Sequence, residues 1–242
     1  MYILTLVIPA KNEAPYIQDA LRRLSKTLSD LTIPWKIIVA NNGSTDDTEQ
    51  KIQELIAVDH KFQETVSVIN CPQTGKGAAI RFVANHIQGD METVFGFIDA
   101  DLSADPDAIP GMIDRIINQQ ADLVIASRLL VTKTTNRGLL RTLSSKGFNF
   151  VTNLLLKLRV ADAQCGLKIM NQKGVELLKT CKETGWFLDI EFLAKVRQDG
   201  LRVVEIPVPW TEFRYPDRKS HISHFRDGIQ AIKAIIRIKQ SC

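Results

Sequence analysis

TVFGFIDADLS, at residues Thr93–Ser103, joins an apolar β-type run to a pair of carboxylates. The run Thr93–Ile98 has the length and composition of a buried strand. Asp99 and Asp101 follow it at once, separated by one alanine. In open α/β sheets, ligands bind beyond the carboxyl ends of the strands. This stretch therefore predicts both a sheet and the edge of that sheet where a site lies.

Similar apolar runs occur on both sides of this stretch, and a helical pattern separates each from the next. The predicted strands are Tyr2–Ile8, Lys36–Val39, Thr65–Ile69, Thr93–Ile98 and Leu123–Ala126. The predicted helices are Ala14–Leu28, Thr45–Val58, Gly77–His86 and Asp107–Asn118, with Ser44 and Asp105 as candidate caps. Alternating strands and helices predict an α/β fold with a single Rossmann-like, doubly wound, mostly parallel sheet.

The second half of the chain has a different pattern. Leu139–Arg159 and Phe225–Lys239 carry apolar residues at three- and four-residue spacing, as amphipathic helices do. Two short strands and two short helices are predicted between them: Leu167–Met170, Lys173–Lys179, Ile190–Gln198 and Val203–Ile206. These shorter elements indicate a helical subdomain that extends the α/β half.

The composition is that of a globular protein, with 45% hydrophobic and 24% charged residues. No apolar run reaches the roughly 18–20 residues of a membrane span. The first apolar run precedes its positive charge, whereas a signal peptide places the charge first. The four cysteines are far apart and form no CxxC pair, which predicts reduced thiols. We therefore expect a cytoplasmic location.

Basic residues are concentrated in one segment. From Arg128 to Ala161 there are seven basic residues and no acidic one, whereas the rest of the chain is slightly acidic. A local excess of this kind indicates an anionic partner such as phosphates, lipid headgroups or nucleic acid. Nucleic acid is disfavoured because only Phe148 and Phe150 could stack on bases in this segment. A solvated basic surface is the alternative interpretation.

The two carboxylates of the opening stretch predict a metal site. Beside a bound diphosphate, Asp99 and Asp101 would repel the ligand unless a cation lay between them. Mg²⁺ or Mn²⁺ fits this requirement, since such hard cations are held by one or two carboxylates together with substrate phosphates. An ordinary turn after a strand is the alternative.

Three further polar clusters lie at predicted strand ends or before a helix: Val7–Glu13, Ala40–Thr48 and Thr74–Ala79. In the first, Pro9 and Lys11 are candidates to line a nucleotide pocket, and Glu13 to accept from a base or ribose. In the second, Asn42 offers a base both a donor and an acceptor. In the third, glycines permit close backbone approach and Lys76 is placed to meet a phosphate.

Taken in this order, the pieces resemble glycosyltransferase family 2, and within it the dolichyl-phosphate (polyprenyl-phosphate) mannosyl- and glucosyltransferase branch. The resemblance covers nearly the whole chain. Its further motifs are IASR (Ile125–Arg128), RTLSSKG (Arg141–Gly147), DAQCGLK (Asp162–Lys168), GWFLDIE (Gly185–Glu191) and VVEIPVPW (Val203–Trp210). It implies a glycosyltransferase A-type fold, with residues 1–127 as the nucleotide-sugar-binding half and 128–242 as the acceptor-binding half of one catalytic domain.

The resemblance also assigns roles to residues. It implies nucleotide-sugar contacts at Pro9, Ala10, Lys11, Glu13, Asn42, Lys76, Asp99, Ala100, Asp101 and Arg214. It implies metal ligation by Asp101 and Asp99, with Ser103 as a weaker third ligand. Arg128 and Arg141 fall where relatives bind donor and acceptor phosphates, and Asp189 falls in the sugar and acceptor block with a positioning or auxiliary-base role. Asp162 either contacts the acceptor or braces its loop.

The implied reaction moves a hexose from a nucleotide diphosphate sugar to polyprenyl phosphate with inversion at the anomeric carbon. UDP-glucose and GDP-mannose both remain possible donors, because Asn41-Asn42 and Ser103 depart from the family pattern. The resemblance favours the glucosyl side slightly. Arg214, Lys219 and His221 are alternatives for the group that closes over the diphosphate.

Three interpretations of the function remain, and they differ in the acceptor or in whether the chain transfers a sugar at all. A lipid acceptor would require Leu139–Arg159 and Phe225–Lys239 to dock peripherally on the cytoplasmic membrane face, apolar side inward. A family 2 enzyme acting on a soluble glycan or protein would bind no membrane. A degenerate module that only binds nucleotide sugars would bind the donor without transferring it.

Overall fold

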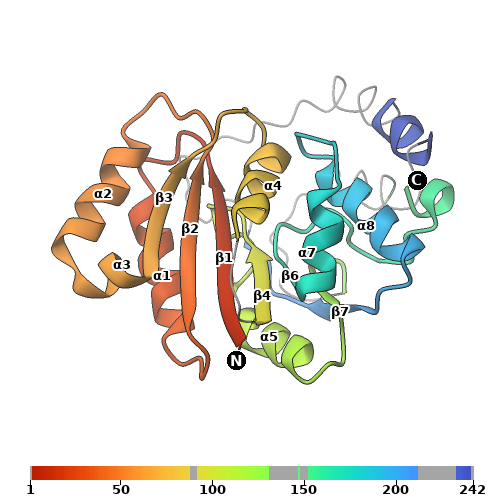
Figure 1. Ribbon diagram of the computed structural model, residues 1–242, viewed down its shortest axis with the longest axis horizontal. Coiled ribbons are helices and arrows are strands. Elements are labelled where there is room, and N and C mark those ends of the chain that lie inside the picture. The colour runs from red at the N-terminus through yellow and green to blue at the C-terminus, as the bar shows by residue number, and fades with distance from the viewer. Residues whose placement is uncertain (1, 88–91, 131–146, 148–151, 212–232, 241–242) are drawn as a thin grey trace.

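The computed structural model describes residues 2–87, 92–130, 147, 152–211 and 233–240, which form one mixed sheet with helices on both faces (Figure 1). The strands are β1 (Tyr2–Ala10), β2 (Trp35–Asn41), β3 (Val66–Asn70), β4 (Glu92–Phe97), β5 (Leu123–Ser127), β6 (Lys168–Met170) and β7 (Val203–Pro207). The helices are α1 (Ile17–Leu28), α2 (Thr48–Val58), α3 (His60–Thr65), α4 (Lys76–His86), the 3₁₀ turn η1 (Pro106–Ala108), α5 (Ile109–Ile117), α7 (Gln172–Lys179) and α8 (Leu188–Gln198).

The seven strands lie in the order β3-β2-β1-β4-β6-β5-β7. Every neighbouring pair is parallel except those of β6, which runs antiparallel to both β4 and β5. Both predicted strands of the second half, β6 and β7, belong to this sheet, so the two halves of the chain build one structure. The predicted α/β fold with a mostly parallel sheet is confirmed.

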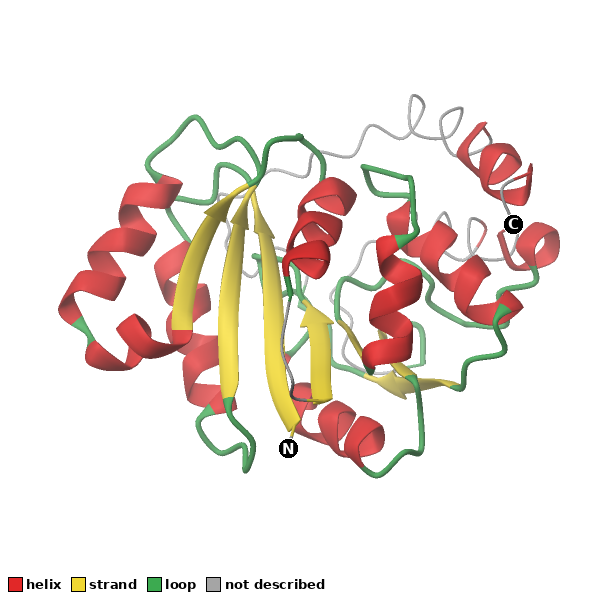
Figure 2. Cartoon of the chain, viewed as in Figure 1, coloured by secondary structure: helices red, strands yellow, loops and turns green. Residues whose placement is uncertain are grey.

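Side chains alternate between the two faces of the sheet along each strand. On β1, Leu4, Leu6 and Ile8 join a core cluster with residues of α1, α2 and α5. Val7 faces the other way and joins a second cluster with α4, α7 and α8. Figure 2 shows the sheet between these helices. Each fully buried aliphatic side chain contributes about 1.5–3 kcal/mol, so the two clusters hold the layers together.

Two helices begin later than the sequence predicts, because loop hydrogen bonds use the residues in front of them. The two helices are predicted to start at Ala14 and Thr45, whereas α1 and α2 each begin three residues later. Ser44 is not a cap: its hydroxyl accepts from the Asn12 N–H at 3.0 Å. The N-cap position of α2 is Asp47, whose side chain makes no capping bond, and Asp46 Oδ1 accepts from the first N–H of the helix at 3.1 Å.

The prediction that Asp105 caps a helix is confirmed, since its carboxylate accepts from the Asp107 N–H at 3.2 Å. Helix α3 was not predicted. Asp59 begins it by accepting from the Lys61 N–H at 2.8 Å. Thr65, predicted to open a strand, is its last residue. The predicted strand therefore starts one residue later.

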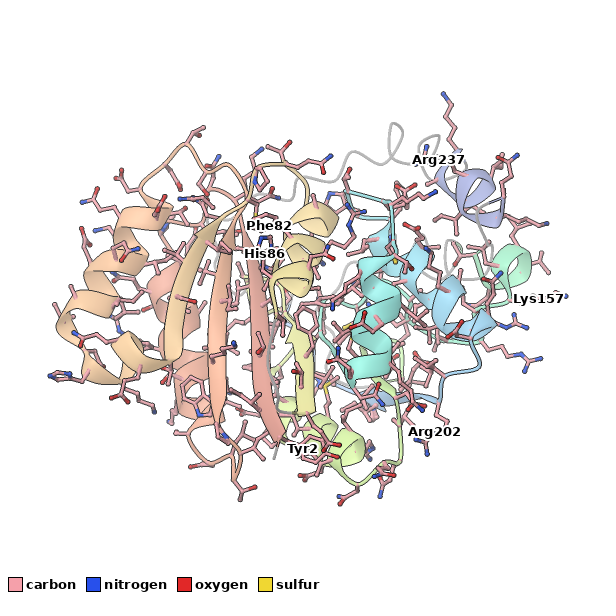
Figure 3. The ribbon with its side chains drawn as sticks, in the orientation of Figure 1. Tyr2, Phe82, His86, Lys157, Arg202 and Arg237 are labelled. Atoms are coloured by element: carbon pink, nitrogen blue, oxygen red, sulfur yellow. The ribbon has the colours of Figure 1, made fainter. Side chains whose placement is uncertain are left out.

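Asp122, just before β5, ties together three strands. Its carboxylate accepts from the Arg202 N–H (2.9 Å) and Nε (3.1 Å) before β7, and from Asn171 Nδ2 (2.8 Å) after β6. Figure 3 labels Arg202 at this edge of the molecule. Burial by itself would raise the pKa of Asp122, but these hydrogen bonds outweigh it and lower the pKa to about 2.

The predicted helix Leu139–Arg159 lies mostly outside the described residues. Its described end is helical at 152–156 only, so the prediction that it runs to Arg159 is wrong. The Asn153 side chain donates to the Val160 carbonyl at 2.7 Å and accepts from its N–H at 3.3 Å. Lys157 and Arg159 take positive φ angles of 51° and 57°. Helical geometry cannot continue through such residues.

Of the predicted helix Phe225–Lys239, residues 233–240 are described, and they are helical. Ala234, Ile235 and Ile238 are buried, whereas Ile236 is half exposed. Within the described ranges, no helix combines the length and hydropathy that crossing a membrane requires.

Candidate active site

The loops after β1 and β2 are joined by hydrogen bonds into one unit. The Asn12 side chain accepts from the Thr45 N–H at 2.8 Å, and the Ala14 N–H donates to Asp46 at 3.1 Å. Asn12 has a φ of 57°, a left-handed conformation that asparagine tolerates better than most residues. These hydrogen bonds fix the shape of the loops at the carboxyl ends of β1 and β2, where the sequence predicts nucleotide contacts.

Asn42 joins this edge to the glycine-containing loop before α4. Its backbone N–H donates to the Ala10 carbonyl at 2.8 Å, and its side-chain Oδ1 accepts from the Gly75 N–H, also at 2.8 Å. Gly75 has a φ of 129°, and a Cβ there would lie 2.2 Å from the Thr184 carbonyl oxygen. Three sequence-predicted pieces, at Ala10, Asn42 and Lys76, are therefore brought to one place.

The Asn41 side chain forms hydrogen bonds inside the protein. Its Nδ2 donates to Asn70 Oδ1 at 2.7 Å, and its Oδ1 accepts from the Ser44 N–H at 3.2 Å. Glu49 accepts from Asn70 Nδ2 at 3.0 Å and completes the group. Of the two asparagines in the turn, Asn42 is thus the one that reaches the candidate site.

A tight turn carries the two predicted metal carboxylates. The Leu102 N–H donates to the Asp99 carbonyl, with Leu102 at a φ of 48°, and the Ser103 N–H donates to Asp101 Oδ1 at 3.0 Å. Ala100 and Ser103 are buried, while Asp99 and Asp101 are partly exposed. The turn therefore presents carboxylates and hides the residues between and after them.

The far side of this turn is fastened to the segment after β7. The Thr211 N–H donates to the Ser103 carbonyl at 2.9 Å, and Ala104 forms an isolated antiparallel bridge with Trp210. Trp210 in turn covers Arg128, whose guanidinium carbon lies 4.8 Å from the ring centroid. Trp210 thus links the segment after the carboxylate turn, through its backbone, to the predicted phosphate-binding arginine, through its side chain.

Lys76 lies between two carboxylates. Its Nζ is 2.6 Å from Asp99 Oδ1 and 4.0 Å from Asp189 Oδ2, and it lies 5.4 Å from the ring centroid of Trp186. Burial by itself would lower the pKa of Lys76, but Asp99 and Asp189 outweigh it and raise the pKa above its usual value. The Lys76 side chain is therefore protonated and lies beside the end of β4.

Arg128 is held by a bidentate ion pair with Asp162. Its Nε donates to Oδ2 at 2.7 Å and its Nη2 to Oδ1 at 3.0 Å. Burial opposes the charge on Arg128, yet Asp162 outweighs it and raises the pKa, with Asp99 contributing from further away. Asp162 therefore braces the loop and aims Arg128, which decides between its two predicted roles. Glu205 holds the loop from below by accepting from the Ala161 and Asp162 N–H groups.

Asp189 lies in the first turn of α8 and is buried. Its Oδ1 accepts from Lys168 Nζ at 2.5 Å. Sequence reasoning missed Lys168, although a lysine inside a predicted apolar strand is a signal that could have found it. Trp186 was also missed as a site residue; it is 55% exposed beside Lys76, within the motif that carries Asp189.

The remaining predicted residues divide into two groups. Pro9 is half-buried at the end of β1, Lys11 is exposed, and Glu13 is buried with its N–H donating to Thr48 Oγ1 at 2.8 Å. All three lie on the joined loops. Arg141, Arg214, Lys219 and His221 lie outside the described residues.

The metal prediction fits the residues present. Within the described ranges, no three His, Cys, Asp or Glu side chains gather as a complete protein cage. Asp99 and Asp101 supply the two carboxylates that Mg²⁺ or Mn²⁺ uses when substrate phosphates complete its shell. Lys76 Nζ lies 2.6 Å from Asp99 Oδ1, so it would have to move from that oxygen for a metal to bind there.

Comparison with known proteins agrees with this geometry. The family model described as Glycosyl transferase family 2 matches residues 5–178. Glycosyltransferase AglD of Haloferax volcanii is 29% identical over 210 residues, which are 85% of this chain and 32% of that protein. The dolichyl-phosphate beta-glucosyltransferase of Saccharomyces cerevisiae is 28% identical over 86% of this chain and 67% of its own length. The chain thus spans about a third of the first relative and two thirds of the second.

Among solved structures, glucosyl-3-phosphoglycerate synthase from Mycobacterium tuberculosis, in complex with Mn²⁺ and UDP-glucose, superposes with a TM-score of 0.69. The match covers 99% of this chain and 78% of that one at 20% identity, so it shows the fold alone. The family match covers more than half of the chain, from within β1 through β6, and includes the turn with Asp99 and Asp101. The chain belongs to glycosyltransferase family 2 and is a glycosyltransferase.

Proposed function

We propose that this glycosyltransferase moves a hexose from UDP-glucose or GDP-mannose to a polyprenyl or dolichyl phosphate, with inversion at the anomeric carbon. The observation that carries the proposal is the charged cluster of Asp99, Lys76 and Asp189 at the end of β4, beside Asn42. Charges of both signs beside the glycine-containing loop before α4 suit a diphosphate leaving group and an anionic acceptor.

The donor would lie over the joined loops. Asn42 uses its Oδ1 inside the protein, so its amide N–H groups are the part that can donate to a base carbonyl. Lys76, at the N-terminus of α4, would meet the diphosphate with its ammonium while the helix end adds a favourable dipole. Pro9, Ala10, Lys11 and Glu13 would line the base and ribose.

Asp99 and Asp101 would hold Mg²⁺ or Mn²⁺, whereas Ser103, the predicted third ligand, is buried behind the turn and would reach a metal only if the turn rearranged. Bound there, the metal would offset the negative charge that develops on the leaving nucleoside diphosphate. The protein's own contribution is to orient these carboxylates, through the Leu102 turn and the hydrogen bond from the Ser103 N–H. Lys76 would then turn from Asp99 toward the phosphates.

The acceptor would enter from the side of Arg128. A lipid phosphate is anionic at neutral pH, so it needs no strong base to remove a proton before attack. It does need orientation, and a guanidinium already locked by Asp162 supplies a fixed positive charge at little entropic cost. Arg141 is proposed to assist, and Asp189 is proposed to position the reacting groups.

The lipid acceptor draws support from the yeast relative, whose name specifies dolichyl phosphate, and from the acid-free basic segment. Leu154 and Leu155 are 66% and 42% exposed on the 152–156 helix, and Ile236 is 53% exposed on the 233–240 helix. We propose that these side chains meet the cytoplasmic membrane face peripherally, with basic residues on lipid headgroups.

A transfer assay tests the proposal. Purified protein with Mn²⁺ or Mg²⁺ would receive radiolabelled UDP-glucose or GDP-mannose, with and without polyprenyl phosphate. Asp101→Ala would test the metal carboxylate, and Asp114→Ala, an exposed aspartate on α5, would be the matched control. Label should enter the organic phase only with lipid phosphate, and only Asp101→Ala should abolish it.

The same assay separates the alternatives. Transfer to a soluble glycan or protein, without binding to liposomes, would favour a soluble acceptor. Tight donor binding without transfer or hydrolysis would indicate a module that only binds nucleotide sugars. Either result would contradict the proposed lipid-linked reaction.

A further inference from the structure

Lys168 is a fully buried lysine in the middle of the sheet. It opens β6, where it pairs with Phe97 of β4 and Ile125 of β5. Its side chain has 0% exposure. A charged side chain with no access to water is costly unless it is paired and hydrogen-bonded. Its contacts should therefore reveal why a lysine is placed there.

The contacts of Lys168 all lie toward the candidate active site. Its Nζ donates to the Cys165 carbonyl at 2.7 Å and to Asp189 Oδ1 at 2.5 Å, and it lies 5.5 Å from the Phe97 ring centroid. Asp189 is itself 4% exposed at the side chain. Both partners are thus held away from water, and their geometry is set by the sheet on one side and α8 on the other.

Asp189 faces two lysines with its two oxygens. Oδ1 is taken by Lys168, and Oδ2 lies 4.0 Å from Lys76 Nζ, which in turn lies 2.6 Å from Asp99 Oδ1. Four side chains of alternating charge therefore run from the interior of the sheet to the carboxylate turn. A carboxylate held at one oxygen cannot rotate freely, so the position of the other oxygen relative to Lys76 is fixed.

We propose that Lys168 is a positioning residue for Asp189. By holding Oδ1, it keeps Oδ2 turned toward Lys76 and the reacting groups. Stability alone does not explain the pair, because a buried ion pair can usually be replaced by apolar residues of similar volume without loss. This inference rests on the proposed function, in which Asp189 belongs to the catalytic site.

A double-mutant cycle tests the role of Lys168. The variants are Lys168→Met, Asp189→Asn and their combination, with Lys168→Arg as the conservative replacement and Lys179→Met, which breaks an ion pair on α7 with Glu176, as the matched control. Each would be measured for kcat/KM in the transfer assay and for thermal unfolding. Should Lys168→Met fail to fold, Lys168→Gln completes the same cycle.

Lys168→Met should lower kcat/KM about 10- to 100-fold, as loss of a partner that orients a functional ligand does. Lys168→Arg should recover part of the loss, and Lys179→Met should change little. In the Asp189→Asn background, Lys168→Met should cause no further loss, since the carboxylate it orients is gone. Independent, additive losses would overturn the positioning role while leaving the proposed function intact. A wild-type chain that transfers no sugar to any acceptor would overturn the proposed function, and this role with it.

Discussion

Gly166→Ala should damage the carboxylate turn while leaving the fold almost unchanged. A methyl carbon at Gly166 would lie 1.9 Å from Asp99 Oδ2 and 2.4 Å from its Cγ. Ordinary contacts begin near 3.4 Å, so the carboxylate would have to move by about 1.5 Å. The obstructing group is the end of a side chain that is 27% exposed, so it can turn toward solvent.

The expected effects on stability and on activity differ in size. Because Asp99 can turn aside, we expect the free energy of unfolding to fall by only about 1–2 kcal/mol, as for mild overpacking. A carboxylate displaced by more than 1 Å no longer faces Lys76 or a metal in the same way. Misplacements of this size cost on the order of 100-fold in rate, and Mn²⁺ affinity should fall as well.

The assay combines Mn²⁺ binding, followed by electron paramagnetic resonance without donor, with kcat/KM for transfer and thermal unfolding. Gly111→Ala is the control, because a Cβ there meets its nearest atom only at 4.0 Å, at the end of the Arg115 side chain. It should keep Mn²⁺ binding and activity, and gain slightly in stability as an alanine in a helix. If Gly166→Ala kept both Mn²⁺ affinity and kcat/KM within twofold of wild type, the reasoning about Asp99 would be refuted.

Three other changes test the remaining charges. Asp162→Asn should lower the free energy of unfolding by about 3–5 kcal/mol, because it leaves Arg128 buried and uncompensated; urea unfolding measures this, and a loss below 1 kcal/mol would contradict it. The Asp122 pKa of about 2 lies below its unfolded value, so the ionised carboxylate should add up to about 2 kcal/mol to the free energy of unfolding above pH 4, and this contribution should be lost as the pH falls toward 2. Urea unfolding of Asp122→Asn and wild type from pH 7 to pH 2 measures this: the variant's free energy of unfolding should depend less on pH, and an equal pH dependence would contradict the prediction. Lys76→Met should raise the donor KM about 10-fold or more, by losing a charge-assisted contact; titration with UDP checks it, and unchanged affinity would place the diphosphate elsewhere.

The positions of most strands along the chain were predictable because burial leaves a strong pattern in the sequence. Strands such as β1 and β5 are nearly continuous apolar runs, as expected of parallel strands covered on both faces. Helix starts were less predictable, since the N–H groups of Thr45 and Ala14, the first residues of the two predicted helices, donate to the side chains of Asn12 and Asp46. Such contacts join residues more than thirty positions apart, which no local pattern records.

The residues of the candidate site were predictable by their chemical type, but their partners were less so. Asp99, Lys76 and Asn42 were each selected because their chemistry suits a nucleotide, and the structure brings them together. The partners of Arg128 and Asp189 were not identified, because an ion pair between Arg128 and Asp162, or Lys168 and Asp189, depends on which strands are neighbours. The direction of β6 in particular has no signature in a run of three residues.

That direction has a consequence for the chemistry of the site. In a parallel strand, the segment that follows the strand lies at the ligand edge; in the antiparallel β6, it is the segment that precedes it. Lys168 therefore pairs with Phe97 and Ile125 close to the carboxyl ends of β4 and β5, and the loop before it reaches the same edge. This places Gly166 against the carboxylate turn and Asp162 against Arg128. A parallel strand in the same position would send both residues to the opposite edge of the sheet, so the reversed direction of β6 in the described sheet is what brings the Asp99–Lys76 and Arg128–Asp162 charge pairs to the same edge.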